Sequence, residues 1–249
     1  MNFEIRDNVE PDFSKKRIVC IGCSCTWGHG IEQNETWPHY LEKLLGRDYQ
    51  CLNMSKCGDG LGEIIPRYKR YDDFIEPKIC IVQPPSFVRQ PFPGIQEESE
   101  KTFSYFGCSL TISPYENMEK IVSKIDYLEA CPLMIDLEME RLKLFYEYLL
   151  SKNVKLILIL YKYIDPCSMG ELKFFYNKYF KDLEKFCNKN KISHIPQFNF
   201  YKNKDKKYLL DQTHPNKYGC EVFANKIYKK MLEERVISIK FNQKKKRKL

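Results

Sequence analysis

Short apolar runs alternate along the chain with longer stretches in which apolar residues recur at helical spacing. The runs are rich in Ile, Val and Leu, which is typical of strands buried on both faces. Because a helical stretch separates each run from the next, the pattern predicts βαβ crossovers and a parallel sheet. We expect strands at Arg17–Gly22, Tyr49–Met54, Ile79–Gln83, Val154–Tyr161 and Ile192–Pro196, and helices at Trp37–Leu45, Leu61–Tyr71, Leu133–Ser151, Gly170–Asn190 and Lys217–Glu234.

Five strands with intervening helices predict a three-layer α/β/α, flavodoxin-like domain. The expected order of its five-stranded parallel sheet is 2-1-3-4-5, which places the ligand crevice beside the first strand. The chain has 249 residues, enough for one large domain of this class. We therefore predict a single domain over residues 1–240.

One segment, 84–132, interrupts the alternation. It carries Pro84, Pro85 and the run Pro91-Phe92-Pro93-Gly94, followed by acidic residues and several aromatic ones. It is too long for a plain strand-to-helix loop. Because it begins where the third strand ends, we predict a cap insertion over the site, with an insertion of no functional role as the alternative.

The composition is that of a globular protein, with 43% hydrophobic and 30% charged residues. No apolar run approaches the roughly 20 residues that cross a bilayer, and the longest, Val154–Tyr161, already contains Lys155. The first residues, Met1 to Asp7, lack the basic start and apolar centre of a signal peptide. We expect no membrane insertion and an intracellular, cytoplasmic location.

Most of the net charge of +8 lies in one terminal cluster. Residues 244–248 are all Lys or Arg and supply five of these eight charges. We predict that residues 241–249 form a disordered basic tail, with a nuclear-import signal or an arm that attracts nucleic acid as alternatives. Away from the tail, nothing in the sequence indicates a nucleic-acid partner, and the sequence does not specify an oligomeric state.

The eleven cysteines are scattered through predicted strands and helices, which favours reduced, buried thiols over a disulfide framework. Cys20 and Cys23 form a C-x-x-C spacing, but a structural zinc site needs a second ligand pair that the sequence lacks. We expect no metal and no cofactor.

The candidate chemistry lies at the two ends of the chain. Ser24 stands between Gly22 and Gly28, directly after the first predicted strand, while Asp211 and His214 are three residues apart ahead of the last predicted helix. A serine, a histidine and an aspartate are the groups needed for nucleophilic acyl transfer. Taken singly, Ser24 could also belong to a phosphate-binding or structural turn, and Asp211 with His214 to a helix cap.

Together these motifs make the chain resemble the SGNH, or GDSL-like, hydrolases, whose sequence blocks occur in the same order. The first block is Gly22-Cys23-Ser24-Cys25-Thr26-Trp27-Gly28, with Cys23 where the family usually has Asp. The second is Asn53-Met54-Ser55-Lys56-Cys57-Gly58-Asp59, and the fourth is Asp211-Gln212-Thr213-His214-Pro215. The resemblance spans nearly the whole chain.

The resemblance implies a role for each matched residue. Ser24 would be the nucleophile, His214 the general base and then acid, and Asp211 the group that orients the imidazole. The backbone N–H groups of Ser24 and Gly58 would form the oxyanion hole, since a residue without a side chain lets a substrate oxygen approach closely. His29 is near enough to Ser24 in sequence to line the same pocket.

The third block departs from the family, which has Gly-x-Asn-Asp after the third strand. Here the sequence is Gln83-Pro84-Pro85-Ser86-Phe87-Val88-Arg89, with no Asn to serve as third oxyanion donor. Either Gln83, Ser86 or Arg89 replaces that donor, or the hole consists of two N–H groups. Ser86 and Arg89 are also candidates for substrate binding.

The resemblance implies a serine esterase that forms a seryl-acyl intermediate. We expect a small-molecule or glycan acyl ester as substrate, with a short O-acyl group on a carbohydrate as the leading case. Two alternatives remain: an acyltransferase that uses the same triad, and a non-catalytic member of the fold that binds a glycan or a protein.

Overall fold

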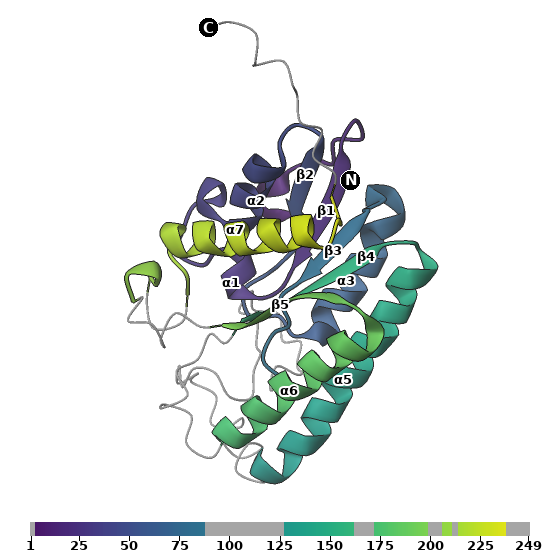
Figure 1. The fold of residues 1–249 in the computed structure, drawn as a ribbon, viewed down its shortest axis with the longest axis vertical. Helices are drawn as coiled ribbons and strands as arrows, with labels where there is room; N and C mark the ends of the chain where they lie inside the picture. The colour runs from purple at the N-terminus through teal and green to yellow at the C-terminus, as the bar shows by residue number, and fades with distance from the viewer. Residues whose placement is uncertain (1–2, 88–126, 162–171, 199–205, 211–213, 238–249) are drawn as a thin grey trace, which may run out of the picture.

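A five-stranded parallel sheet forms the centre of the protein, with strand order β2-β1-β3-β4-β5 (Figure 1). The structure is a computed structural model that describes residues 3–87, 127–161, 172–198, 206–210 and 214–237. The predicted fold class and strand order are confirmed. The strands are β1 (Lys16–Ile21), β2 (Tyr49–Asn53), β3 (Ile79–Val82), β4 (Lys155–Tyr161) and β5 (Ser193–Phe198).

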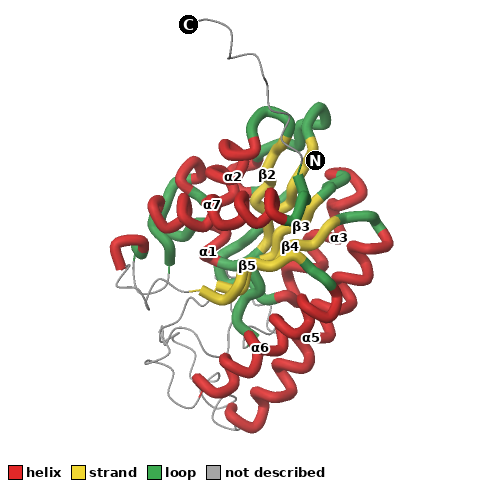
Figure 2. Tube along the Cα trace, in the orientation of Figure 1, coloured by secondary structure: helices red, strands yellow, loops and turns green. Residues whose placement is uncertain are grey.

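Helices cover both faces of the sheet (Figure 2). One face packs against α2 and α7, and the other against α3, α5 and α6. The α-helices are α1 (Ser24–Trp27), α2 (Trp37–Leu45), α3 (Leu61–Ile75), α5 (Tyr127–Ser151), α6 (Leu172–Asn190) and α7 (Lys217–Glu233), and the short 3₁₀ turns are η1 (Arg6–Asn8), η2 (Gln33–Glu35) and η4 (Lys206–Tyr208).

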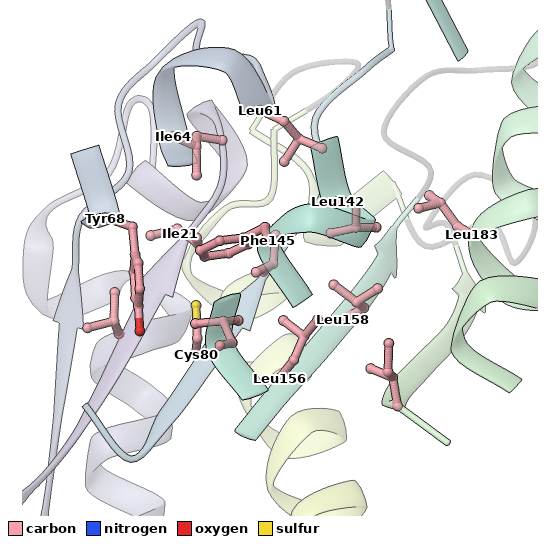
Figure 3. Close-up of a cluster of buried hydrophobic side chains, with 14 of the residues drawn as sticks. Ile21, Leu61, Ile64, Tyr68, Cys80, Leu142, Phe145, Leu156, Leu158 and Leu183 are labelled. Atoms are coloured by element: carbon pink, nitrogen blue, oxygen red, sulfur yellow. The ribbon is translucent and has the colours of Figure 1, made fainter. Parts of the chain in front are cut away.

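The sheet divides the core into two clusters, because successive side chains of a strand point to opposite faces. In β1, Ile18 and Cys20 face α2 and α7, whereas Val19 and Ile21 face α3, α5 and α6. Figure 3 shows part of the cluster that faces α3, α5 and α6, in which helical side chains meet strand residues over the middle of the sheet. Burial on both faces explains why these strands are continuously apolar in the sequence.

The helices differ from the sequence prediction chiefly at α1, α3 and α5. Helix α1, a single turn at Ser24–Trp27, was not predicted as a helix, since four residues carry no periodicity. Helix α3 continues to Ile75, which is fully buried against the sheet. Helix α5 begins at Tyr127 and includes Pro132, because the buried Cys131 and Ile135 pack into the core on either side of the proline.

Some predictions fall outside the described residues. Of the proposed cap, 84–132, the structure describes 84–87 and also 127–132, which belong to α5; residues 88–126 lie outside. The basic tail, 241–249, lies wholly outside. In the described parts of the chain, no helix is long and apolar enough to cross a membrane.

Helix α5 offers a matched pair of leucines for testing the core. Leu142 is fully buried against the sheet, whereas Leu144, two residues later, is 54% exposed. Leu142→Ala should lower the free energy of unfolding by about 2–5 kcal/mol through lost burial and the cavity left behind. Leu144→Ala should change it by about 0.5 kcal/mol or less. Urea denaturation measures both, and equal losses would contradict the described packing of α5.

Candidate active site

The predicted site residues gather where three neighbouring strands end. Strand β1 runs into Ser24, β2 into the loop that holds Gly58, and β3 into Gln83. Because β1 pairs with both β2 and β3, these three carboxyl ends meet at one edge of the sheet. Strands β2 and β3 lie on opposite sides of β1, so the strand order reverses at β1. Open α/β sheets bind their ligands at such a point, outside the carboxyl ends of the strands.

Ser24 is the first residue of α1, and its hydroxyl meets an imidazole from the far end of the chain. Ser24 Oγ lies 2.9 Å from His214 Nε2, a hydrogen-bond distance between residues 190 positions apart in sequence. Ser24 is 8% exposed and His214 is half-buried, so the pair is reachable from solvent but mostly enclosed. A hydroxyl that can donate to an imidazole is the arrangement by which serine is activated as a nucleophile.

His214 is held in place by the backbone around it. The Leu210 N–H donates to the His214 carbonyl at 2.8 Å, and Leu209 pairs with Pro215 in an isolated antiparallel bridge. Two residues after His214, Asn216 caps α7 by accepting from the N–H groups of Tyr218 and Gly219. The histidine is therefore fixed between a short bridge and a capped helix start.

A chain of contacts joins this pair to the glycine loop. The ring of His29 lies against that of His214, with centroids 4.7 Å apart. His29 Nδ1 in turn lies 3.8 Å from Cys57 Sγ, next to Gly58 in sequence. Gly58 has a φ of 90°, in the left-handed region that glycine adopts without steric cost. These contacts bring Ser24, His29, His214 and the loop of Gly58 to one place.

Buried polar side chains support the turn that carries Ser24. The Asn53 amide donates to the Thr26 carbonyl at 2.8 Å and accepts from the Ser55 N–H at 3.2 Å, so it ties α1 to the Gly58 loop. From the other side, the Thr26 hydroxyl donates to Gln83 Oε1 at 2.5 Å. Unsatisfied polar groups at the ends of a short helix are costly when buried; the Asn53 amide satisfies the Thr26 carbonyl, and the Gln83 amide satisfies the Thr26 hydroxyl.

A buried ion pair between Arg67 and Asp59 supports the Gly58 loop. Arg67 of α3 lies 2.5 Å from the carboxylate of Asp59 and donates to the Met54 carbonyl at 3.0 Å. Burial raises the pKa of Asp59, and the Arg67 guanidinium opposes that rise. Arg67 thus binds the loop at both ends, five residues apart.

Of the four remaining residues that the sequence predicted for the site, the structure describes two. Ser86 is buried and its hydroxyl bonds to that of Tyr176 on α6. Gln83 is bound to Thr26 through its oxygen, and its Nε2 has no hydrogen-bond partner among the described residues. Asp211 and Arg89 lie outside the described residues, so the acid of the predicted triad remains a prediction.

The thiols of the C-x-x-C spacing are both buried. Cys20 belongs to the core and Cys23 precedes α1, and neither forms a disulfide. Within the described ranges, no three His, Cys, Asp or Glu side chains are placed to hold a metal ion.

Sequence reasoning missed the groups that support the site. Nothing in the polar first residues signalled Arg6, whose guanidinium donates to the carbonyls of Trp27, Gly28 and Ile31. Arg67 resembled any charged residue of an amphipathic helix. Asn53 was part of the quoted second block, but its bridging contact depends on how two loops approach each other, which one sequence does not reveal.

Several solved structures share this fold across most of the chain. The psychrotrophic esterase EstA from Pseudoalteromonas sp. superposes with a TM-score of 0.60 over 90% of this chain and 100% of its own, at 13% identity. A putative lipolytic protein of the G-D-S-L family from Desulfitobacterium hafniense gives 0.57 over 87% and 99%, at 12% identity. A putative acylhydrolase from Bacteroides fragilis gives 0.56 over 91% of each chain, at 16% identity.

No protein-family model matches the sequence, and no curated protein sequence matches it either. The structural matches cover most of each chain and show that this chain has the same fold as these proteins. At 12–16% identity they describe the backbone arrangement alone, and the chemistry depends on this chain's own side chains.

The Asp59–Arg67 pair gives a stability prediction. Asp59→Asn removes the negative charge beside a buried guanidinium and should cost about 3–5 kcal/mol. The matched control is Asp73→Asn: Asp73 pairs with Lys152 at 2.6 Å, but its side chain is 75% exposed. Its loss should cost about 1 kcal/mol or less. Chemical denaturation measures both, and a cost for Asp59→Asn no larger than that of Asp73→Asn would contradict the buried pair.

Proposed function

We propose that this protein is a serine esterase that cleaves a short O-acyl group from a polar acceptor such as a carbohydrate. The observation that carries the proposal is the 2.9 Å approach of Ser24 Oγ to His214 Nε2 at the carboxyl edge of the sheet. The SGNH/GDSL fold supports it, because its solved examples include esterases and acylhydrolases.

The first half of the reaction forms an acyl-enzyme. The Ser24 hydroxyl passes its proton to His214 Nε2 while its oxygen attacks the ester carbonyl, and the carbonyl oxygen becomes an oxyanion. The resulting imidazolium then gives the proton to the alkoxide of the leaving alcohol as the carbon–oxygen bond breaks. Asp211, three residues before His214, is proposed to hold the imidazole tautomer and to stabilise its cation.

The second half releases the acid. A water molecule donates a proton to His214 and attacks the acyl carbon, and the imidazolium returns the proton to Ser24 as the ester bond to serine breaks. Free enzyme and a carboxylic acid result. If an acceptor hydroxyl replaces the water, the same steps give acyl transfer, so product analysis separates the two activities.

We propose that the oxyanion is held by the backbone N–H groups of Ser24 and Gly58. Ser24 begins a helix, where N–H groups have no intrahelical acceptor. Neither described third-donor candidate faces an open site: the Ser86 hydroxyl is bound to Tyr176, and the Gln83 side chain is fully buried beside Thr26. Each missing donor costs about 10²–10³ in turnover, so the enzyme should be slow if Arg89, which lies outside the described residues, supplies no donor either.

The rim of the site favours a polar acceptor. His29 packs on His214, Cys57 contacts His29, and Lys56 precedes Cys57 in the same loop; all three are exposed, and each carries a polar or ionisable group. Sugar hydroxyls can exchange hydrogen bonds with such groups, whereas a long acyl chain needs a continuous apolar channel.

The serine and histidine assignments predict sharp losses of activity. Ser24→Ala and His214→Ala should each lower ester turnover by about 10⁴-fold or more, and Asp211→Asn should leave a measurable remainder. The readouts are hydrolysis of short-chain aryl esters and acetylated sugars, together with labelling of Ser24 by a fluorophosphonate probe.

His194→Gln is the control for a histidine outside the site, because in the described part of the chain its ring bonds locally, 3.3 Å from the Ile192 carbonyl. It should keep wild-type turnover. Full activity in His214→Ala would refute the mechanism. Absence of labelling in well-folded wild-type protein, with ligand binding retained in Ser24→Ala, would instead identify a non-catalytic binding protein.

A further inference from the structure

The N-terminal segment Phe3–Val9 contacts both loops of the candidate site. Glu4 pairs with Lys56 of the Gly58 loop at 2.8 Å, and Arg6 bonds the loop that follows Ser24. Between them, Ile5 is buried in the core beside the sheet. Tertiary contacts therefore anchor this segment across the carboxyl edge of the sheet.

Arg6 is a buried cation held by carbonyl groups. It is 8% exposed, and it donates to the carbonyls of Trp27 and Gly28 from Nη1 and to that of Ile31 from Nη2, at 2.7 Å for the last. Its guanidinium also lies over the Trp27 ring, 5.0 Å from the centroid. Within the described residues no carboxylate pairs with it, so these carbonyls and the ring face offset the cost of burying its charge.

Two of the three carbonyls that Arg6 binds, those of Trp27 and Gly28, lie at the end of the helix that carries Ser24. Trp27 is the last residue of α1, and Gly28 is its C-cap with a φ of 84°. Carbonyl groups at a helix C-terminus lack intrahelical donors and attract positive charge. The fit is close, since a Cβ at Gly28 would lie 2.6 Å from Arg6 Nη1.

The loop that Arg6 holds also carries His29. The His29 ring packs on that of His214, which is bonded to Ser24. A shift of residues 27–31 therefore acts on the serine through α1 and on the histidine through His29.

The backbone of the segment indicates that its shape is imposed by these contacts. Glu4, Asp7 and Asn8 have φ values of 49°, 56° and 53°, in the left-handed region that costs most residues free energy. Such a conformation persists when surrounding contacts over-determine it.

We propose that Arg6 is a positioning residue of the active site, which fixes the Ser24 turn and the His29 loop through their backbone carbonyls. The kinetic consequence of this proposal rests on the esterase function proposed above. Its structural consequence, the placement of His29 and His214, is independent of that function.

Arg17 provides a matched control at the opposite edge of the sheet. It is also a buried arginine, 6% exposed, and it donates to the carbonyls of Ile75 and Lys15. It lies at the amino end of β1, whereas Ser24 follows the carboxyl end. Arg17→Ala therefore removes a comparable set of bonds to carbonyls, together with a 3.5 Å pairing to the exposed Glu76, without touching the site.

The kinetic test compares Arg6→Ala and Arg6→Lys with Arg17→Ala, well below each melting temperature. Arg6→Ala should slow fluorophosphonate labelling of Ser24 and lower kcat by about 10- to 100-fold, with KM little changed, because misplaced groups lose reactivity more than binding. Arg6→Lys should recover part of this, since an ammonium lacks the fork that bonds several carbonyls at once. Millimolar guanidinium chloride should partly restore Arg6→Ala.

The structural test uses the four histidines of the chain, which give few imidazole signals in an NMR spectrum. In Arg6→Ala and Arg6→Lys the signals of His29 and His214 should shift, while that of His194 should not; in Arg17→Ala both site signals should stay. Unchanged site signals in both Arg6 variants, or equal kinetic losses in Arg6→Ala and Arg17→Ala, would overturn the proposal. If the Arg6 variants shift these signals but fluorophosphonate does not label the wild-type protein, the positioning role would stand and the esterase function would be refuted.

Discussion

The candidate site depends on the two hydrogen bonds that the side-chain amide of Asn53 makes. It donates to the Thr26 carbonyl in the turn after β1 and accepts from the Ser55 N–H in the loop after β2. These two loops hold Ser24 and Gly58, and no regular secondary structure joins them. A buried amide that bonds both backbones sets their separation, and the low local polarity strengthens each bond.

The parallel sheet explains why such connections are needed at this edge. Strands β1, β2 and β3 satisfy one another's backbone groups as far as Ile21, Asn53 and Val82. Beyond these residues, irregular loops must find other partners for their N–H and carbonyl groups. Asn53, Arg6 and Arg67 supply partners to backbone carbonyls, and Gln83 accepts from the Thr26 hydroxyl; all four residues are buried. Groups that satisfy the backbone in this way also leave the loops little freedom to move.

The sequence was sufficient for the fold because the sheet is buried on both faces. Continuous apolar runs such as Ile79–Val82 have few interpretations, and helical spacing between them defines the crossovers. The pairing of Ser24 with His214 was inferred from two short motifs, and the structure brings these residues together. Neither α1 nor the contacts of Arg6 could be predicted, because one depends on a single turn and the other on tertiary approach between segments that carry no local pattern.

In the third sequence block, residues that depart from the family pattern pack against helix α6. At Ser86, where a donor was sought, the hydroxyl bonds to Tyr176 of α6, and Phe87 packs on the Tyr176 and Tyr179 rings at 4.8 and 5.5 Å between centroids. The segment after β3 is therefore anchored to α6, on the face of the sheet away from α2 and α7. A residue used to anchor this segment is not available to an oxyanion at the same time. In the mechanism proposed above, the oxyanion is stabilised by the backbone N–H groups of Ser24 and Gly58, and buried side chains such as Asn53 hold the loops that carry them.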